Sequence, residues 1–267
     1  MKSYLSYFIL RFKMNLQYRA AAISGIVTQF FFGFIQIFVY LAFYESGSGT
    51  LPMPLNQLIS YVWFSQAFFA IIYLWQKDKE ILLLIRNGNI SYELCRPQNL
   101  YFMWMAKILG QRLANVSLRF LPILIVASFL PEPYTLSLAI SIPNFIIFII
   151  SLLLSFILMV LIATLCHIGC IFTIDDRGVI NIAMIIADIF SGMVIPVPFF
   201  PNTMQVIANI LPFRYISDFP FRFYVGNISQ SEALYSILIQ ILWIIILFFL
   251  GKILMEKALK KAVIQGG

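Results

Sequence analysis

The chain has 267 residues, of which 61% are hydrophobic and 11% charged, whereas soluble domains are roughly half apolar and about a quarter charged. This composition excludes an ordinary water-soluble domain, because a soluble core cannot hold the excess of apolar side chains. The net charge of +7 does not indicate a nucleic-acid partner, because the basic residues stand beside apolar stretches and form no continuous stripe. We therefore expect an all-α integral membrane protein, with residues 1–267 forming one transmembrane domain.

Residues 1–19 predict an amphipathic helix that lies at the membrane interface. Apolar residues recur there at helical spacing, at Leu5, Phe8, Ile9, Phe12 and Leu16. Basic residues are distributed around the polar side. The segment has no small-residue cleavage site, so it does not have the features of a signal peptide.

Six apolar stretches follow that are long enough to cross a membrane, since a span takes about 20 residues. They lie at about residues 20–44, 55–75, 108–130, 138–172, 179–195 and 234–254. The segments between them are shorter and richer in charged or turn-forming residues, apart from two longer connections. The sequence therefore predicts six transmembrane helices.

Those two connections have distinctive compositions. Residues 76–107 mix charges with short apolar patches, and they predict a cytoplasmic loop with helical pieces. Residues 196–230 are apolar but broken by proline and glycine, and they predict short re-entrant helices at the outer face. Non-helical backbone is tolerated at membrane depth only where protein or water satisfies its polar groups.

The distribution of lysine and arginine predicts the orientation. With the amino terminus inside, only Arg214 and Arg222 among the basic residues of the connecting and terminal segments lie outside. The opposite orientation would violate the positive-inside rule. We therefore expect a multi-pass protein of the cell membrane with both termini in the cytoplasm.

The sequence carries no set of residues that predicts an enzyme. A nucleotide-binding loop of the form GxxxxGK[ST] is missing from the sequence, so we expect no ATP hydrolysis by this chain, no catalytic residues and no cofactor of its own. His167, the single histidine, lies between Cys166 and Cys170. This spacing does not form a ligand face on one helix and lacks a fourth ligand, so we expect a packing role and no metal site. The odd cysteine count, with Cys95, favours free thiols.

Two charged residues lie deep inside predicted spans, away from their ends: Arg119 in the third and Asp188 in the fifth. A charge at membrane depth costs about 2.5–3.5 kcal/mol even on insertion scales, so each must face protein, water or an opposite charge. Both residues lie near the middle of a span. They predict either an ion pair between two helices or the lining of a polar translocation path.

Two short segments resemble a known family. Residues 86–97 read RNGNISYELCRP, with the pattern R-x-G-x-I-x-x-x-L-x-R-P, and residues 211–226 read LPFRYISDFPFRFYVG. The first resembles the cytoplasmic loop of ABC type 2 transporter permeases, and the second is similar to the segment before their last span. The order of an interfacial helix, six spans, a coupling loop and re-entrant helices is also similar to that family.

The resemblance implies a permease subunit of an ATP-driven exporter that moves an amphipathic lipid, peptide or drug outward. ATP and Mg would be bound by a partner ABC ATPase, and two permeases would pair within membrane lipid, with a different chain favoured over a second copy. The coupling residues would be Arg86, Gly88, Ile90, Glu93, Leu94, Arg96 and Pro97, and the extracellular gate would include Pro196, Pro198, Pro212, Arg214 and Asp218.

Other interpretations remain open at this point. Gly88 and Pro97 can mark a helix end and a helix stop in any loop. A secondary carrier or channel that needs no ATPase would use Asp188 and Arg119 for coupling or selectivity. A membrane protein without transport activity, acting as a structural partner, is a third interpretation.

Overall fold

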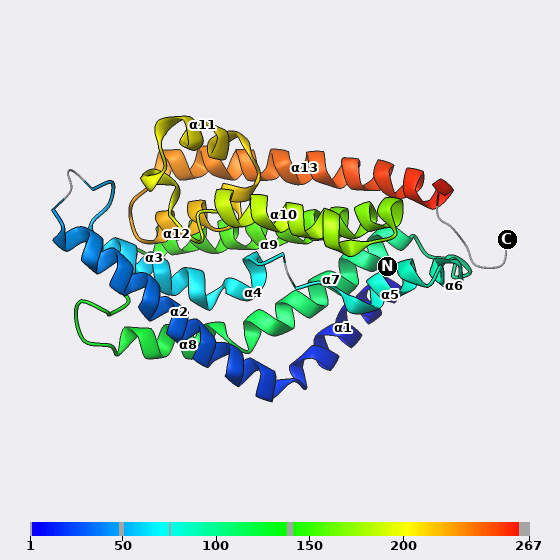
Figure 1. The fold of residues 1–267 in the computed structure, drawn as a ribbon, viewed down its shortest axis with the longest axis horizontal. Helices are drawn as coiled ribbons and strands as arrows, with labels where there is room; N and C mark the ends of the chain where they lie inside the picture. Colours follow the sequence, from blue (N-terminus) through cyan, green and yellow to red (C-terminus); the bar gives the residue numbers. More distant parts are fainter. Residues whose placement is uncertain (1, 48–50, 75, 138–140, 262–267) are drawn as a thin grey trace.

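The computed structural model describes residues 2–47, 51–74, 76–137 and 141–261, and within these ranges all regular structure is helical (Figure 1). In chain order the helices are α1 (Lys2–Leu16), α2 (Arg19–Glu45), α3 (Leu55–Ala67), α4 (Phe69–Ile72), α5 (Lys79–Arg86), α6 (Ile90–Leu94), α7 (Leu100–Ser117), α8 (Phe120–Ser128), α9 (Ile142–Thr173), α10 (Asp176–Phe190), α11 (Asn202–Ile210), α12 (Asp218–Tyr224) and α13 (Gln230–Lys261). Two short 3₁₀ helices, η1 (Val197–Phe199) and η2 (Phe213–Tyr215), flank α11.

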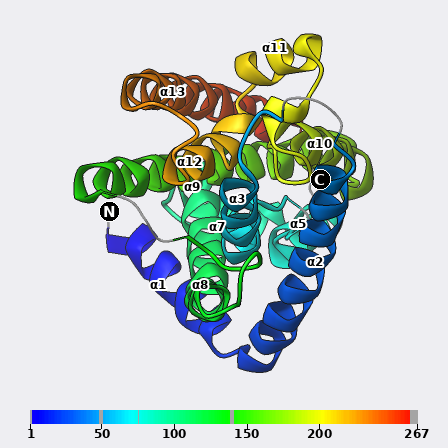
Figure 2. The same ribbon diagram turned by 90° about the vertical axis from the view of Figure 1, so that its left-hand side faces the viewer.

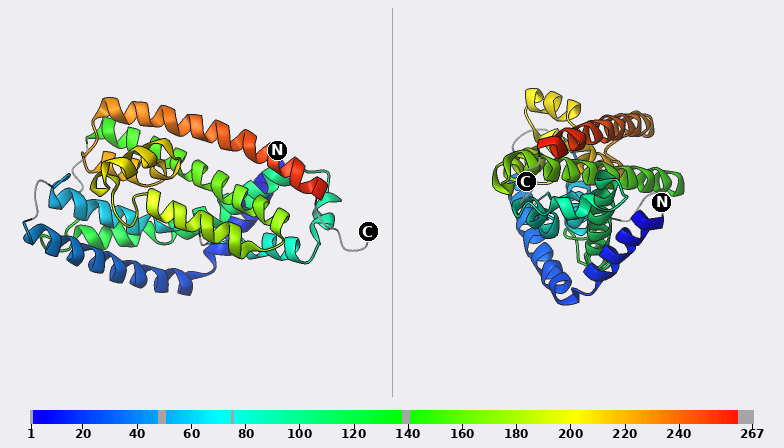
Figure 3. Two further views of the ribbon diagram at one scale, coloured as in Figure 1. Left: turned by 45° about the horizontal axis from the view of Figure 1, so that its top comes forward. Right: turned by 90° about the vertical axis from the view of Figure 1, so that its right-hand side faces the viewer.

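The long helices lie side by side along the longest axis of the molecule (Figure 1). Helices α5 and α6 lie at one end of this bundle, called here the α5–α6 end, and α11 and α12 lie at the opposite end. Helix α13 runs the length of the bundle towards the α5–α6 end (Figure 3). Helix α1 leans away from the bundle axis and meets α2 at a sharp bend (Figure 2). Its oblique course fits the predicted interfacial helix.

Four helical segments are long and apolar enough to cross a membrane: Arg19–Glu45, Leu100–Ser128, Ile142–Thr173 and Gln230–Lys261. Large apolar side chains are exposed along them, for example on α13 at Leu234, Leu238, Leu242, Ile245, Phe249 and Ile253. Water would not favour such a surface over so long a helix, whereas lipid tails do. The described residues therefore form an all-helical, multi-pass membrane protein.

Helix length does not confirm the other two predicted spans. The stretch predicted at 55–75 forms α3, with 13 residues, and α4, with four. The stretch predicted at 179–195 forms the 15-residue α10, which is about 22 Å long at 1.5 Å per residue, against a hydrocarbon core of about 30 Å. Helix α10 ends early because the chain turns at Gly192, where φ is +77°.

Helix α3 lies inside the bundle, with every residue from Leu58 to Ala67 buried. The helix breaks after Ala67, and α4 ends where the backbone becomes extended at Tyr73. The fully buried Arg112 of α7 donates from Nη1 to the Ile71 and Tyr73 carbonyls at 2.9 and 3.0 Å. A cation at a helix C-terminus satisfies carbonyls that the helix cannot pair itself. The interruption is thereby enclosed and hydrogen-bonded by protein.

The loop before α7, the helix of the third predicted span, is shorter than the sequence predicts. The loop expected at 76–107 ends at Asn99, whose Oδ1 accepts hydrogen bonds from the Tyr101 and Phe102 amides at 3.0 and 3.4 Å. This side-chain cap starts α7 at Leu100, before the purely apolar stretch begins. The start of the fourth predicted span, at 138–140, lies outside the described residues.

Candidate functional site

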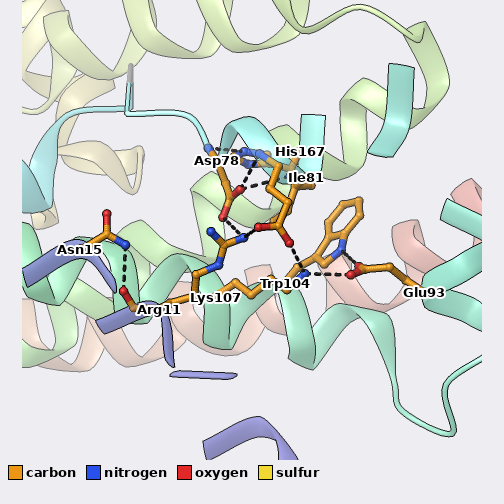
Figure 4. A network of polar contacts seen from close by, with 9 residues as sticks. Arg11, Asn15, Asp78, Ile81, Glu93, Trp104, Lys107 and His167 are labelled. Carbon is orange, nitrogen blue, oxygen red and sulfur yellow. Dashed lines mark hydrogen bonds and ion pairs between the residues drawn. The ribbon is translucent and has the colours of Figure 1, made fainter. Parts of the chain in front are cut away.

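The α5–α6 loop, residues 78–97, begins at a helix cap that also ties the loop to two other helices. Asp78 Oδ1 accepts hydrogen bonds from the Glu80 and Ile81 amides at 3.0 and 3.1 Å, which caps α5. The backbone amide of Asp78 donates to His167 Nε2 of α9 at 3.1 Å. Its second carboxylate oxygen lies 3.5 Å from Arg11 Nη2 of α1 (Figure 4). The start of α5 is therefore held by α1 and α9 together.

Helix α5 ends at Arg86, and Gly88 lies just beyond its C-cap Asn87, where one of the sequence interpretations places a helix end. Gly88 has a φ of +66°, a conformation that glycine adopts without a Cβ clash. The Gly88 amide donates to the Ile85 carbonyl at 3.2 Å, and the Asn89 amide donates to the Leu84 carbonyl at 2.9 Å. This pair of bonds is the Schellman motif. It reverses the chain so that α6 begins at Ile90.

The loop has a buried side and an exposed side. Its buried residues are Asp78, Ile81, Leu82, Ile85, Ile90 and Glu93. Its exposed residues are Lys79, Glu80, Leu83, Arg86, Asn87, Tyr92, Leu94, Cys95, Arg96 and Pro97. Adjacent residues can lie on opposite sides of the loop: Tyr92 is 71% exposed, whereas Glu93 is 8% exposed. Apolar and basic side chains are thus presented outward by a loop that is anchored from beneath.

Glu93 anchors α6 to α7. Its Oε1 lies 2.8 Å from Lys107 Nζ, and its Oε2 accepts a hydrogen bond from Trp104 Nε1 at 3.3 Å (Figure 4). Both partners are buried. Lys107 also lies 3.3 Å from Glu80 Oε1 at the start of α5. A buried charge is tolerated where it is paired and hydrogen-bonded, so this arrangement holds α5 and α6 at a fixed position on α7.

Helix α1 supports the same loop with one face. Residues Tyr4, Tyr7 and Arg11 lie three and four positions apart, so they share that face. The Tyr4 hydroxyl accepts from the Asn99 amide at 2.9 Å, and the Tyr7 hydroxyl accepts from Arg96 Nη1 at 2.7 Å. Arg11 also pairs with Glu80. The opposite face of α1 exposes apolar residues, including Leu5, Ile9 and Met14, as expected of a helix that touches lipid.

The close approach of α1 to α7 depends on Gly110. A Cβ atom at this position would lie 2.5 Å from the Phe8 carbonyl oxygen of α1 and 3.1 Å from Arg11 Cβ. Backbone atoms cannot yield to such a contact by a change of rotamer. The lack of a side chain at Gly110 therefore lets the α1 backbone lie directly on α7 and brings Arg11 to the loop.

His167 packs between helix α9 and the start of α5, and both of its ring nitrogens contact backbone groups. Its Nδ1 lies 2.7 Å from the Ala163 carbonyl oxygen, and its Nε2 accepts the Asp78 amide proton. This pair of contacts assigns the neutral ring with its proton on Nδ1. Both nitrogens are then engaged by backbone groups. Across the part of the chain that the structure describes, no three His, Cys, Asp or Glu side chains are arranged to hold a metal ion.

The structure separates Arg119 from Asp188. Arg119 lies at the junction of α7 and α8 and packs against Gly25 of α2. A Cβ atom added at Gly25 would lie 2.6 Å from the Cζ atom of Arg119. Asp188 of α10 has the Tyr73 hydroxyl as its hydrogen-bond partner. Among the described ion pairs none joins Arg119 to Asp188, and the alternative that they line a polar translocation path stays a prediction. The kink between α7 and α8 gives Arg119 a different neighbour.

At the α11–α12 end, Asp218 is the centre of a second polar cluster. Its Oδ2 lies 3.4 Å from Arg222 Nη1 and 4.0 Å from Arg214 Nε. Its Oδ1 accepts from the Val197 amide at 3.0 Å and lies 3.4 Å from the Tyr61 hydroxyl. Asp218 is fully buried. The cluster therefore joins η1 and α12 to the buried helix α3.

The predicted gate residues divide into two groups. Arg214 and Asp218 belong to this cluster. The prolines bound the short helices: Pro196 and Pro198 lie at η1, and Pro212 directly precedes η2. The structure thus places them at the turns of the segment 196–230.

The sequence did not predict the long-range contacts of the loop. Arg11, Lys107 and Trp104 come from α1 and α7, and nothing in their spacing indicates that they meet Glu80 or Glu93. The one local signal was Asp78, because an Asp before the apolar pattern Ile81, Leu82 and Ile85 is typical of a helix N-cap.

Comparison of the sequence with known proteins identifies its family. No curated protein matches the sequence. The family model described as ABC-2 family transporter protein matches residues 30–266. This match includes α5, α6 and the segment 196–230, and it covers far more than half of the chain. The chain therefore belongs to the ABC-2 family of transporter proteins, as a membrane permease that associates with an ABC ATPase.

Proposed function

We propose that the chain is the permease subunit of an ATP-driven exporter and that the exposed side of the α5–α6 loop is the contact for its ATPase. The observation that carries this proposal is the division of the loop, with Tyr92 exposed beside the buried Glu93. Large aromatic and basic side chains contribute most of the binding energy at protein interfaces. Exposed Tyr92 and Arg96 supply such side chains at one end of the bundle, and the exposed Leu83 adds apolar surface beside them.

The buried side of the loop supports a mechanical role. Ion pairs link α5 and α6 to α1 and α7 through Arg11, Glu80, Glu93 and Lys107. A loop held in this way moves as a rigid body with its helices when a bound ATPase closes around nucleotide. Under this proposal Glu93 and Ile90 transmit the motion and do not touch the ATPase. ATP and Mg are held by the ATPase, and this chain performs no catalysis.

The orientation follows from the same assignment. An ATPase works in the cytoplasm, so the α5–α6 end faces inward together with the basic end of α13, Lys257 to Lys261. Helix α1 then lies along the inner leaflet, and the segment 196–230 lies at the outer face. Buried α3 with α4, and α10, complete six crossings, with their breaks enclosed by protein.

The resemblance to ABC type 2 transporter permeases also suggests a substrate class and a partner permease. Exposed apolar residues on α2 and α10, such as Phe31, Phe38, Ile182 and Ile185, fit a membrane pathway for an amphipathic lipid, peptide or drug. A second permease completes the transporter, and we favour a different chain over a second copy of this one.

Copurification with the ATPase tests the proposed contact. We expect Leu83→Ala combined with Tyr92→Ala to reduce the ATPase retained by the tagged chain about tenfold or more, because interface aromatic side chains are often hot spots. The retained subunit is quantified by mass spectrometry after purification in mild detergent, with ATP hydrolysis measured on the same sample. The matched control is Tyr235→Ala, which removes a tyrosine exposed to 65% at the opposite end.

The control should retain the ATPase at the wild-type level. If the double variant keeps both the ATPase and its activity, the exposed side of the α5–α6 loop is not the contact. If the wild-type chain purifies alone yet transports when reconstituted, the ATP-driven mechanism itself fails.

A further inference from the structure

A cavity of about 440 Å³ opens at the α11–α12 end, between α11, η2 and the first turns of α13. Helix α11 and the start of α13 lie at the same end of the bundle (Figure 1). Apolar parts of Val206, Ile210, Tyr235 and Ile239 line much of it. Its volume falls within the range of sites for small organic ligands. The lining alone would suit any alkyl chain.

Arg214 gives this cavity a charge. Its side chain is only 9% exposed, yet it contributes to the cavity lining. The structure records no hydrogen bond from its guanidinium to another described residue, and Nε is buried without a hydrogen-bond partner. A guanidinium carries five N–H donors. Among the described residues its charge meets the Tyr215 ring, 5.3 Å from Cζ, and Asp218 Oδ2, 4.0 Å from Nε. Neither contact is a hydrogen bond, so the donors of the guanidinium are available to an acceptor in the cavity.

Arg214 shares its nearest carboxylate, Asp218, with Arg222. Asp218 Oδ2 lies 4.0 Å from Arg214 Nε but only 3.4 Å from Arg222 Nη1. Asp218 also accepts the Val197 amide. One carboxylate thus faces two guanidinium groups, which leaves one positive charge in surplus, and Arg214 is the one of the two that lines the cavity.

We propose that this cavity binds an anionic amphiphile, with a phosphate or carboxylate head on Arg214 and an alkyl chain along Val206, Ile210 and Ile239. Guanidinium groups bind such heads through paired hydrogen bonds, and they do so more strongly where water is excluded. The apolar lining explains why a free inorganic anion would not be sufficient. The binding site is independent of the proposed ATPase contact, since it lies at the other end of the bundle.

Glu232 sets the strength of this binding. It lines the same cavity but is exposed, and it forms no ion pair with Arg214 among the described residues. A carboxylate beside an anionic head is repulsive, although water screens an exposed charge. Glu232→Gln should therefore strengthen binding of the anion without changing binding of neutral lipid.

Native mass spectrometry of the purified chain in a neutral detergent tests the site with four probes. These are dodecyl phosphate, phosphatidylglycerol, phosphatidylcholine and inorganic phosphate. We expect one anionic amphiphile per chain to be retained in preference to phosphatidylcholine, and inorganic phosphate not to be retained. Arg214→Gln should weaken retention of the anionic probe at least tenfold, and Glu232→Gln should strengthen it two- to fivefold. Retention of phosphatidylglycerol alone identifies a membrane lipid, whereas retention of dodecyl phosphate alone identifies a single-chain amphiphile.

Two further variants separate binding from folding. Val206→Trp fills the cavity from an exposed position without removing Arg214, and it should weaken binding as strongly as Arg214→Gln. Arg222→Gln leaves Asp218 to pair with Arg214 alone, so by the same charge balance it should weaken retention of the anionic probe, but less than Arg214→Gln does. Equal retention of anionic and neutral lipid by the wild type, or unchanged retention in both Arg214→Gln and Val206→Trp, would overturn the proposal.

Discussion

Replacing Lys107 with Met is expected to lower the free energy of unfolding by about 3–5 kcal/mol, because Glu93 would keep a buried charge without its cation. The two charged atoms lie 2.8 Å apart, and their side chains are 4% and 8% exposed. The Trp104 hydrogen bond would remain, but it carries no compensating charge. Thermal unfolding in detergent measures the effect, and ATPase activity of the complex reports whether the loop still transmits motion.

The charge can be tested separately from the packing. Lys252→Met removes an exposed lysine from α13 and should change stability by less than about 0.5 kcal/mol. The double variant Lys107→Met with Glu93→Gln removes both charges, so it should regain at least half of the stability that Lys107→Met loses. A Lys107→Met protein as stable as Lys252→Met would show that this ion pair does not anchor the loop.

Replacing Asp218 with Asn should also cost about 3–5 kcal/mol, because the buried Arg214 and the partly buried Arg222 would lose their shared carboxylate. Asparagine keeps the shape of the side chain and an acceptor for the Val197 amide. The expected loss therefore reports the charge and not a cavity. Opening of the segment 196–230 should precede global unfolding, and limited proteolysis within that segment measures it.

Glu232→Gln is the matched control, since it removes an exposed carboxylate from the same end of the bundle. It should leave both thermal stability and the proteolysis rate close to wild type when no anionic lipid is present. If Asp218→Asn is cleaved in the segment 196–230 no faster than Glu232→Gln, the Asp218 cluster does not hold that segment in place.

The fold could be predicted where its signal is local. Apolar length predicted the four long helices, and proline and glycine predicted the short helices of 196–230. Gly88 predicted the end of α5, because a positive φ there suits glycine. Helix ends depended on caps that composition does not reveal, such as Asn99 at the start of α7. The interruption at 68 was missed because both flanking segments are apolar and no proline or glycine marks it. The interruption at 118–119 does have a local signal, because Pro122 in the first turn of α8 cannot donate to the Leu118 carbonyl.

The candidate site was predicted in position but not in detail. The pattern Arg86 to Pro97 identified the loop, yet Glu93, grouped there with the residues of the ATPase cleft, lies on the side that faces α7. Its partner Lys107 lies 14 residues away, and Arg11 lies 69 residues from Glu80. A single sequence does not reveal which opposite charges meet at such separations. For the same reason, the sequence did not indicate that Arg119 lies against Gly25 of α2.

Cross-linking from Cys95 measures the ATPase contact directly. Cys95 is exposed on the α5–α6 loop, whereas Cys166 and Cys170 are buried, so a thiol-reactive photo-cross-linker should attach at Cys95 first. A control chain with Cys95→Ser and Ser231→Cys carries the same label at the opposite end. The preparation used is one that contains the ATPase subunit and hydrolyses ATP.

We expect light to join the labelled Cys95 chain to the ATPase subunit, to do so in a nucleotide-dependent way, and to leave the Ser231→Cys control without this product. Cross-linking of the ATPase from the control but not from Cys95, or its absence from Cys95 in an active complex, would contradict the assignment of the α5–α6 loop as the ATPase contact.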